Sequence, residues 1–343
     1  MKALRYHGPK ELRYEDVPDV SPRSGEVKLR IRAVGICGSD VHGYLGITGR
    51  RIPPMTMGHE FSGEIVELGE GVDGLTVGDR VACFPFGFDG TCDTCRRGDF
   101  TLCENRILYG VLTDDGAFAD YLCVTQGTCI KLADSVSFEA GSLIEPLTVA
   151  YHATGRIPAD MIRGKNVLLV GAGTIGLMTL LCLKKRGAAQ ILVSDLGDSR
   201  LELAKRMGAT HVFNPSRDDV PAKAFELTGG MGVDAAFEAV GATPTVQAAM
   251  SSLRRGGMAV WIGNSQKIIE VNMQEVVTRE LTITGTNAFS LETFKEAARM
   301  INDGEVDVSP IISRVAPMAE GVELFRTLAE NPGDLIKVVL GNA

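Results

Sequence analysis

The residues best suited to chemistry in this chain form two short motifs near its beginning. The first contains Cys37, followed by Ser39 and His42, and the second contains His59 and Glu60. A thiolate, an imidazole and a carboxylate are usual protein ligands of zinc, and a catalytic zinc keeps three such ligands and one open position. Ser39 and His42 lie beside Cys37 in the sequence, where a site that moves protons would need them. Taken alone, the two motifs fit a buried free cysteine and a structural histidine equally well.

A second cluster of candidate metal ligands contains Cys92, Cys95 and Cys103. Their spacing is typical of a closed structural zinc loop, which needs four ligands. A fourth cysteine would be expected three residues before Cys92, but the chain has Asp89 there. Because aspartate can bind zinc, Asp89 completes the site in one interpretation. In the other, the loop binds zinc weakly or not at all.

A glycine-rich turn, Gly171-Ala172-Gly173-Thr174-Ile175-Gly176, directly follows the apolar segment 167–170 and opens a helical segment. In this context the first glycine permits a tight turn and the second lets the backbone approach a pyrophosphate. The third allows close packing of helix on strand. The free N–H groups at the helix N-terminus then face the phosphates. The pattern predicts a dinucleotide site, and the alternative is a glycine turn in a domain without a nucleotide.

An acidic residue, Asp195, ends the next expected strand. It would accept hydrogen bonds from both hydroxyls of the adenosine ribose, and its charge would repel a 2′-phosphate. This favours NAD over NADP. Arg200 argues the other way, but it lies on the following helix and can simply flank the adenine.

The sequence pattern changes near residue 148, and the elements on either side of this change must position these residues. Up to about residue 148 the chain is rich in short alternating segments (26–34, 63–69 and 77–82), which predict an irregular β domain with long loops. Beyond it, strands and helices alternate, which predicts a parallel sheet covered on both faces. The expected strands are 165–170, 190–195, 211–213, 233–238, 258–262 and 281–284, and the expected helices are 174–186 and 199–207.

After about residue 290 we expect one helix, 291–301, and a closing strand, 335–340, which pack back on the first domain. Glu145 precedes Pro146, just before the sequence pattern changes near residue 148. It is either a charged residue at a domain hinge or a carboxylate that binds a metal or its water. Arg50 and Arg51 form a small basic spot between the two metal motifs, either solvated or holding a substrate phosphate.

Composition excludes several classes of protein. The chain has 343 residues, a net charge of −8 and no basic run, which argues against nucleic acid or an anionic membrane as partner. The uncharged stretch 166–183 is interrupted by the three glycines of the turn, so we interpret it as strand, turn and helix. The uneven spread of eight cysteines, with no secretory signal, favours metal binding in a reducing cytoplasm over a disulfide framework.

Together these motifs resemble the zinc-dependent medium-chain dehydrogenases over almost the whole chain. The resemblance is strongest to the polyol branch, which includes sorbitol and galactitol-phosphate dehydrogenases. Glu60, the segment Glu145-Pro146-Leu147 and Ser194-Asp195-Leu196 followed by Arg200 carry it.

The resemblance implies a GroES-like catalytic domain from residues 1–147 and 290–343, and a Rossmann NAD-binding domain from 148–289. It implies Cys37, His59 and Glu60 as ligands of a catalytic zinc, with Glu145 as a further ligand or water partner. It also implies a homodimer or homotetramer joined near residues 281–289. The expected cofactor contacts are Gly171, Gly173, Thr174, Ile175, Gly176, Asp195, Arg200, Ile262 and Thr286.

The implied reaction is the interconversion of a secondary alcohol and a ketone with hydride transfer to NAD. Zinc would act as a Lewis acid, and the proton would leave through Ser39, the nicotinamide ribose and His42. Gly43, Ala288 and Phe289 replace residues that sorbitol dehydrogenases use near the substrate, so the expected substrate is a polyol or polyol phosphate rather than sorbitol itself. Threonine or a vicinal diol such as butanediol is the alternative substrate, and a non-catalytic NAD-binding protein is the rival from another class.

Overall fold

The computed structural model describes residues 1–98 and 102–341, which form two compact units. Unit 1 comprises Met1–Glu145 with Phe289–Ala343, and unit 2 comprises Pro146–Ala288. The boundaries expected from the sequence, 147/148 and 289/290, lie one or two residues from these, and residues 342 and 343 of the last expected range lie outside the described residues. No helix of the described part is long and apolar enough to span a membrane.

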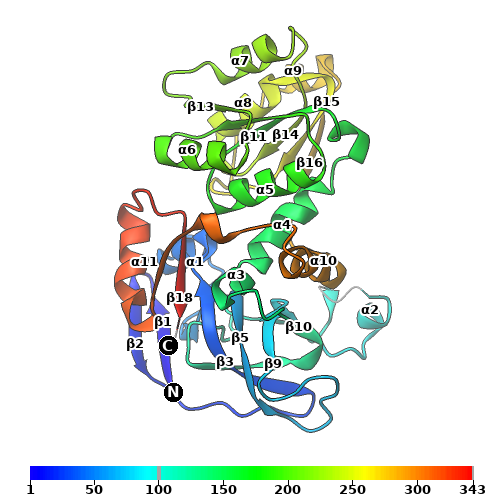
Figure 1. Cartoon of the computed structure of the whole chain (residues 1–343). Helices are drawn as coiled ribbons and strands as arrows, with labels where there is room; N and C mark the ends of the chain where they lie inside the picture. Colours follow the sequence, from blue (N-terminus) through cyan, green and yellow to red (C-terminus); the bar gives the residue numbers. More distant parts are fainter. Residues whose placement is uncertain (99–101, 342–343) are drawn as a thin grey trace. The chain divides into compact units, whose positions relative to one another are not determined.

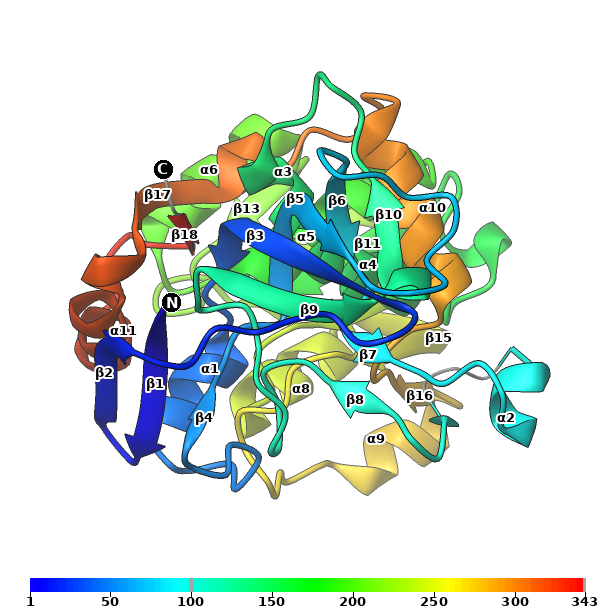
Figure 2. The same cartoon turned by 90° about the horizontal axis from the view of Figure 1, so that it is seen from below.

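The main sheet of unit 1 has seven strands among the described residues, in the order β10-β6-β5-β3-β18-β17, with β9 also paired to β3. Figure 2 shows β3, β5, β6 and β10 side by side. β17 and β18, which follow unit 2 in the sequence, complete the sheet that β3 begins. The strands are β3 (Glu26–Gly35), β5 (Glu60–Leu68), β6 (Arg80–Cys83), β9 (Tyr121–Thr125), β10 (Cys129–Lys131), β17 (Ile312–Pro317) and β18 (Lys337–Gly341).

Smaller elements surround this sheet. A three-stranded sheet has the order β2-β1-β4, and β7 pairs with β8. The strands are β1 (Lys2–Gly8), β2 (Glu11–Asp16), β4 (Met55–Thr56), β7 (Phe86–Gly87) and β8 (Ile107–Leu108). The helices are α1 (Gly38–Tyr44), α2 (Asp93–Arg96), α3 (Phe138–Ser142), α10 (Leu291–Asn302) and α11 (Gly321–Glu330), with 3₁₀ turns at Gln126–Thr128, Ser309–Ile311 and Met318–Glu320.

The expectation of a single helix after residue 290 is wrong, because α11 and the strand β17 follow α10. α11 begins without a side-chain cap, so the usual start signal of a helix is absent from the sequence. Its Leu324 and Phe325 are buried in the core of unit 1, and this packing stabilises the helix.

Unit 2, all of which the structure describes, contains a six-stranded sheet in the order β13-β12-β11-β14-β15-β16, with every pair parallel. This is the strand order of a Rossmann fold. Figure 1 shows α5 and α6 on one side of the sheet and α8 on the other, and the same helices contact its strands. The expected α/β class, a GroES-like β-rich domain plus a Rossmann domain, is confirmed.

The sequence explains these elements locally. Four of the five residues of β11 are buried, as a strand covered on both faces requires. α6 ends at Gly208, whose φ of 110° closes the helix in the left-handed region.

The strands of unit 2 are β11 (Asn166–Val170), β12 (Gln190–Ser194), β13 (His211–Phe213), β14 (Val233–Glu238), β15 (Leu253–Trp261) and β16 (Thr282–Gly285). The helices are α5 (Thr174–Lys185), α6 (Asp198–Met207), α7 (Val220–Leu227), α8 (Thr243–Ser251) and α9 (Met273–Thr278), with a 3₁₀ turn at Ala159–Met161; the division between the units falls inside α4 (Ile144–Thr154).

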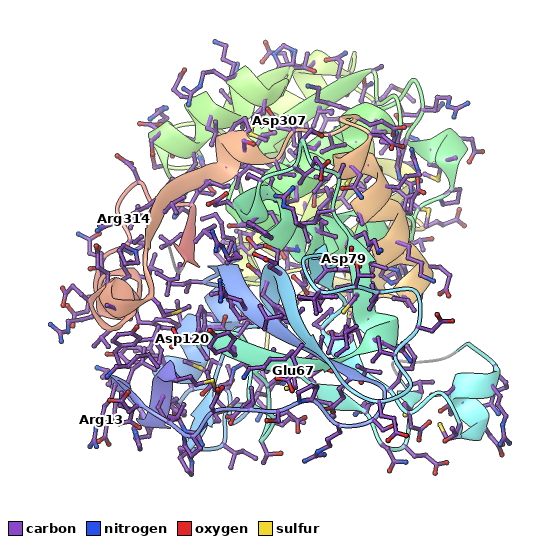
Figure 3. The ribbon with its side chains drawn as sticks, turned by 60° about the horizontal axis from the view of Figure 1, so that its bottom comes forward. Arg13, Glu67, Asp79, Asp120, Asp307 and Arg314 are labelled. Carbon is purple, nitrogen blue, oxygen red and sulfur yellow. The ribbon has the colours of Figure 1, made fainter. Side chains whose placement is uncertain are left out.

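Of the charged side chains of unit 1 that Figure 3 labels, Arg13, Glu67, Asp307 and Arg314 are exposed. Glu67 of β5 is exposed, and Asp79, just before β6, pairs with Lys131 of β10 at 2.8 Å. The described part of unit 1 nevertheless buries six charged side chains. One of them is Lys28, and the other five are Asp40, Arg51, Glu60, Glu145 and Lys337. Because burying a charge is costly unless it is paired or functional, this group locates a candidate site.

Candidate active site

The register of two antiparallel strands brings the predicted metal ligands together. Gly35, at the end of β3, lies opposite Glu60, at the start of β5. Cys37 follows β3 as the N-cap of α1, and His59 immediately precedes β5. The ligand atoms of Cys37, His59 and Glu60 all lie within 4.8 Å of one another. Residues far apart in sequence thus meet at one end of the sheet.

Asp40 links the two halves of this cluster. Its Oδ2 accepts a hydrogen bond from the Cys37 backbone N–H at 3.2 Å, and its Oδ1 lies 3.4 Å from His59 Nδ1. The same Oδ1 accepts a hydrogen bond from Arg51 at 2.7 Å. Asp40 is fully buried, and burial alone would raise its pKa, but the charges of His59 and Arg51 outweigh burial and lower it. Asp40 therefore remains ionised.

Asp40 has the reverse effect on His59. Burial lowers the pKa of His59, but the nearby charge of Asp40, with a smaller effect of Cys37, raises it well above its ordinary value. His59 Nδ1 is buried yet lacks a hydrogen bond of good geometry within the described residues. A carboxylate beside one ring nitrogen is the usual support of a metal-binding histidine, because it fixes the ring and leaves the other nitrogen for the metal.

Lys337 provides the positive charge beside Glu60. Its Nζ donates to Glu60 Oε2 at 2.6 Å and to the Ile36 carbonyl at 3.1 Å, and both side chains of the ion pair are buried. A Cβ atom at Gly35 would stand 2.3 Å from Glu60 Oε2, so a glycine is needed where the carboxylate crosses β3. Removing one member of such a pair would leave a buried, uncompensated charge.

Glu145, the second residue of α4, is a second buried carboxylate beside this cluster. Burial raises its pKa to about 8, the neighbouring Glu60 adds to the increase, and the positive charges of His59 and Lys337 oppose it. A buried carboxyl group with a strongly perturbed pKa beside candidate metal ligands is typical of a functional site.

The predicted proton-transfer residues Ser39 and His42 both lie on α1. They are three positions apart, so they share one face of the helix. Ser39 is exposed, and its Oγ accepts a hydrogen bond from Arg51 at 3.4 Å, whereas His42 is half-buried. Arg51 itself is buried and paired with Asp40, so it is not the solvated or phosphate-binding residue that the sequence suggested.

The donor set of this cluster fits a zinc ion. One thiolate, one imidazole and one carboxylate converge, the imidazole is backed by a buried carboxylate, and Glu145 lies next to them. The sequence motifs alone did not predict Lys337 or the supporting roles of Asp40 and Arg51. Asp40 had a local signal, since it stands three residues after Cys37 in a capping box.

The second predicted cluster also comes together. The ligand atoms of Asp89, Cys92, Cys95 and Cys103 lie within 4.8 Å of one another, and α2 brings Cys92 and Cys95 onto one turn. Asp89 Oδ1 accepts hydrogen bonds from the Thr91 and Cys92 backbone N–H groups, and Asn105 donates to its Oδ2 at 2.8 Å. Four converging donors of these types fit a closed structural zinc site.

The glycine turn of unit 2 has the geometry that a pyrophosphate needs. Gly171 has a φ of 99°, and Gly173 is the N-cap of α5 with open space where a Cβ would stand. A Cβ at Gly176 would lie 1.8 Å from the Gly171 carbonyl oxygen, so the turn and the helix cannot pack around any larger residue. The turn lies at the carboxyl end of β11, beside the point where the strand order reverses.

Asp195 follows β12 and lies against the same turn. Its Oδ2 accepts a hydrogen bond from the Ala172 N–H at 2.7 Å, and its Oδ1 accepts one from the Gly197 N–H at 2.8 Å. Arg200 lies 3.9 Å from Asp195. Ile262 and Thr286 follow β15 and β16 at the same edge of the sheet, which places all the predicted cofactor residues along its carboxyl end.

Known proteins match both units. Residues 23–134 match the alcohol dehydrogenase GroES-like domain, and residues 174–303 match the zinc-binding dehydrogenase family. Sorbitol dehydrogenase of Homo sapiens is 36% identical, with 98% of this chain and 95% of that protein covered.

Two solved structures are similar to this chain over almost its whole length. Galactitol-1-phosphate dehydrogenase from Escherichia coli has a TM-score of 0.87 at 29% identity, with 100% of both chains covered. A zinc-binding dehydrogenase from Sinorhizobium meliloti bound to NADP has a TM-score of 0.90 at 27% identity, with 99% of both chains covered. The chain therefore belongs to the zinc-dependent medium-chain dehydrogenases and, within them, to the branch of polyol oxidoreductases.

Proposed function

We propose that this protein reversibly oxidises a secondary hydroxyl of a polyol or polyol phosphate to a ketone, with NAD as the hydride acceptor. The observation that carries the proposal is the convergence of Cys37, His59 and Glu60 beside the exposed hydroxyl of Ser39. When bound, zinc and the nicotinamide supply Lewis-acid polarisation of the substrate hydroxyl and an acceptor for hydride.

The chain's own residues would do the rest. The zinc would be held by Cys37, His59 and Glu60. Asp40 would orient His59, and Lys337 would balance the charge of Glu60. Ser39 would accept the proton released by the substrate hydroxyl while its own proton passes on toward His42, which lies on the same face of α1 and would exchange it with solvent.

Zinc dependence is tested with a panel of polyols, polyol phosphates, diols and threonine, assayed with NAD before and after chelation. We expect turnover on a polyol or its phosphate, and its loss on chelation. Cys37→Ala and His59→Ala should lower turnover by about 10³-fold or more, the scale of losing the main electrostatic stabilisation of a transition state. NAD binding, measured by fluorescence titration, should persist in both variants. Full activity in either variant would contradict the proposal.

The choice of NAD rests on Asp195. Its carboxylate stands next to the glycine turn, where the adenosine ribose binds in a Rossmann fold, and a 2′-phosphate would meet its negative charge. Asp195→Ser should raise kcat/KM for NADP relative to NAD by about tenfold or more, because it removes a repulsion worth about 1.4 kcal/mol or more. The matched control is Arg200→Ala, which should leave the preference for NAD in place. A wild-type enzyme that already prefers NADP would refute this assignment.

Sorbitol itself is a poor candidate as substrate. Phe289, one of the replacements noted in the sequence, is buried and packs against Phe84, Phe86 and Phe294, so it offers no group to a substrate hydroxyl. In the substrate panel we expect sorbitol to react less well than the best polyol phosphate.

The assembly we propose is a homodimer or homotetramer in the cytoplasm. β16 ends the parallel sheet, and its partly exposed edge is available to a second copy of the chain. None of the eight cysteines, all of which the structure describes, is in a disulfide, which suits a reducing compartment. Sedimentation equilibrium tests the assembly, and a monomer at micromolar concentration would contradict it.

A further inference from the structure

Arg51 is a buried cation that makes two contacts near the metal-ligand cluster. One nitrogen of its guanidinium donates to Asp40 Oδ1 at 2.7 Å and to Ser39 Oγ at 3.4 Å. The other terminal nitrogen donates to the Arg50 carbonyl at 3.3 Å. Arg51 as a whole is only 6% exposed. An ion pair with Asp40 would explain the burial, but it does not by itself explain why the guanidinium also reaches Ser39.

The stem of Arg51 lies against α1 at Gly43. A Cβ atom built at Gly43 would stand 2.4 Å from Arg51 Cγ, and Cγ belongs to the stem of a buried side chain, which has little freedom to move. Gly43 lies within α1 and has no positive φ, so the backbone conformation does not require glycine there. Since glycine costs about 1 kcal/mol in a helix relative to alanine, its presence is explained by the space that Arg51 occupies.

The contact with Ser39 has a chemical consequence. A hydroxyl has one proton to donate and two lone pairs that accept. When the guanidinium occupies one lone pair, the hydroxyl proton must point elsewhere, and the second lone pair is free to receive a proton from substrate. A lysine would keep a charge beside Asp40, but it lacks the rigid planar group in which one nitrogen faces Asp40 and Ser39 while the other faces the Arg50 carbonyl.

We propose that Arg51 is a positioning residue for the Ser39 hydroxyl, and that residue 43 is glycine because the Arg51 stem lies against it. This inference rests on the proposed function, in which Ser39 accepts the substrate proton. The competing explanation is that Arg51 only compensates the charge of Asp40, and the two differ in whether its effect passes through Ser39.

A kinetic double-mutant cycle separates these explanations. Arg51→Lys should lower kcat by about a hundredfold, the scale of losing a positioned proton-transfer group, with little change in the KM for NAD. In a Ser39→Ala background the same substitution should change kcat by less than about twofold, because the group it positions is gone. Zinc content, measured by mass spectrometry of the metal, should stay at the wild-type value. The control is Arg13→Lys, an exposed arginine of β2 outside the site, whose substitution should have no effect.

A second cycle tests the steric part without any assay of activity. Gly43→Ala should lower the urea midpoint of unfolding in the wild-type background, and should lower it much less in an Arg51→Ala background. Gly43→Ala also displaces Arg51 without removing its charge. If Arg51→Lys folds poorly, Gly43→Ala replaces it in the kinetic cycle, and we expect the same pattern of kcat.

Three outcomes would overturn the inference or its basis. Equal losses of kcat from Arg51→Lys with and without Ser39 would show that Arg51 acts only on the fold or the metal site. Additive unfolding midpoints would refute the link between Gly43 and Arg51. A zinc-loaded wild type that turns over no member of the substrate panel would contradict the proposed function and the role of Ser39, whereas the unfolding cycle would still decide the steric part.

Discussion

Glu60 and Glu145 are two buried carboxylates with different electrostatic surroundings. Lys337 pairs with Glu60 at 2.6 Å, whereas burial raises the pKa of Glu145 to about 8. Without a metal, Glu145 therefore carries a proton at neutral pH. The unfolded chain ionises the same group near 4.5, so the folded state binds more protons between these two values.

The first prediction concerns the stability of the metal-free protein. Because the folded state binds the extra proton, the free energy of unfolding should fall as pH rises from 4.5 to about 8. Glu145→Gln has no proton to lose and should flatten this dependence. Urea unfolding of chelator-treated protein across that range measures it. Parallel curves for the wild type and the variant would show that Glu145 does not contribute.

At the scale of elements, local signals in the sequence were sufficient where a motif stands next to its own strand or helix. The glycine turn after β11 and the cysteine motif after β3 were predicted in this way, as were the strands of unit 2 and its helices α5 and α6. The helices α7, α8 and α9 were not predicted. The partners that are distant in sequence were not. Lys337 and Glu60 are 277 residues apart, and no spacing within β18 shows which carboxylate will meet its single lysine.

Sequence patterns also fail where an element depends on packing alone. α11 has no cap, and Arg51 looks like half of an exposed basic pair until the fold buries it against Gly43. In both cases the free energy comes from contacts with other elements, and local propensity contributes little.

The glycine turn yields a prediction with an internal control. Gly173→Ala meets no atom within 4 Å, so the variant should fold normally yet lose about tenfold or more in NAD affinity, since its methyl group faces the space for the pyrophosphate. Gly176→Ala collides with the Gly171 carbonyl and should cost about 1–3 kcal/mol of stability. Thermal unfolding and NAD titration of both variants separate the two effects. Equal destabilisation by both would refute this division of roles.

At the scale of the whole molecule, the two metal-ligand clusters give different expectations for zinc removal. The Cys37 cluster should govern turnover, and the Asp89 cluster should govern stability, because it has four protein ligands and no open position. The purified protein should then hold about two zinc ions per chain, one in each cluster.

Asp89→Ala should reduce the zinc content to about one ion per chain and lower the melting temperature, while the remaining folded enzyme keeps its turnover. Asp93→Ala changes an exposed carboxylate in the same loop, outside the cluster, and should retain both ions. Metal analysis and thermal unfolding give the result. An Asp89→Ala protein with an unchanged zinc content would mean that Asp89 is not a ligand.

The place of β18 in the sheet of unit 1 has a consequence for biosynthesis. Residues 146–288 contain every strand of their own sheet, so unit 2 can fold while the ribosome is still translating the rest of the chain. β3, which leads to Cys37, gains its neighbour β18 only after unit 2 has been made. Until Lys337 emerges, Glu60 lacks the buried ammonium group that pairs with it, so the charge balance around the metal-ligand cluster is incomplete. The site that is first in the sequence is therefore among the last to form.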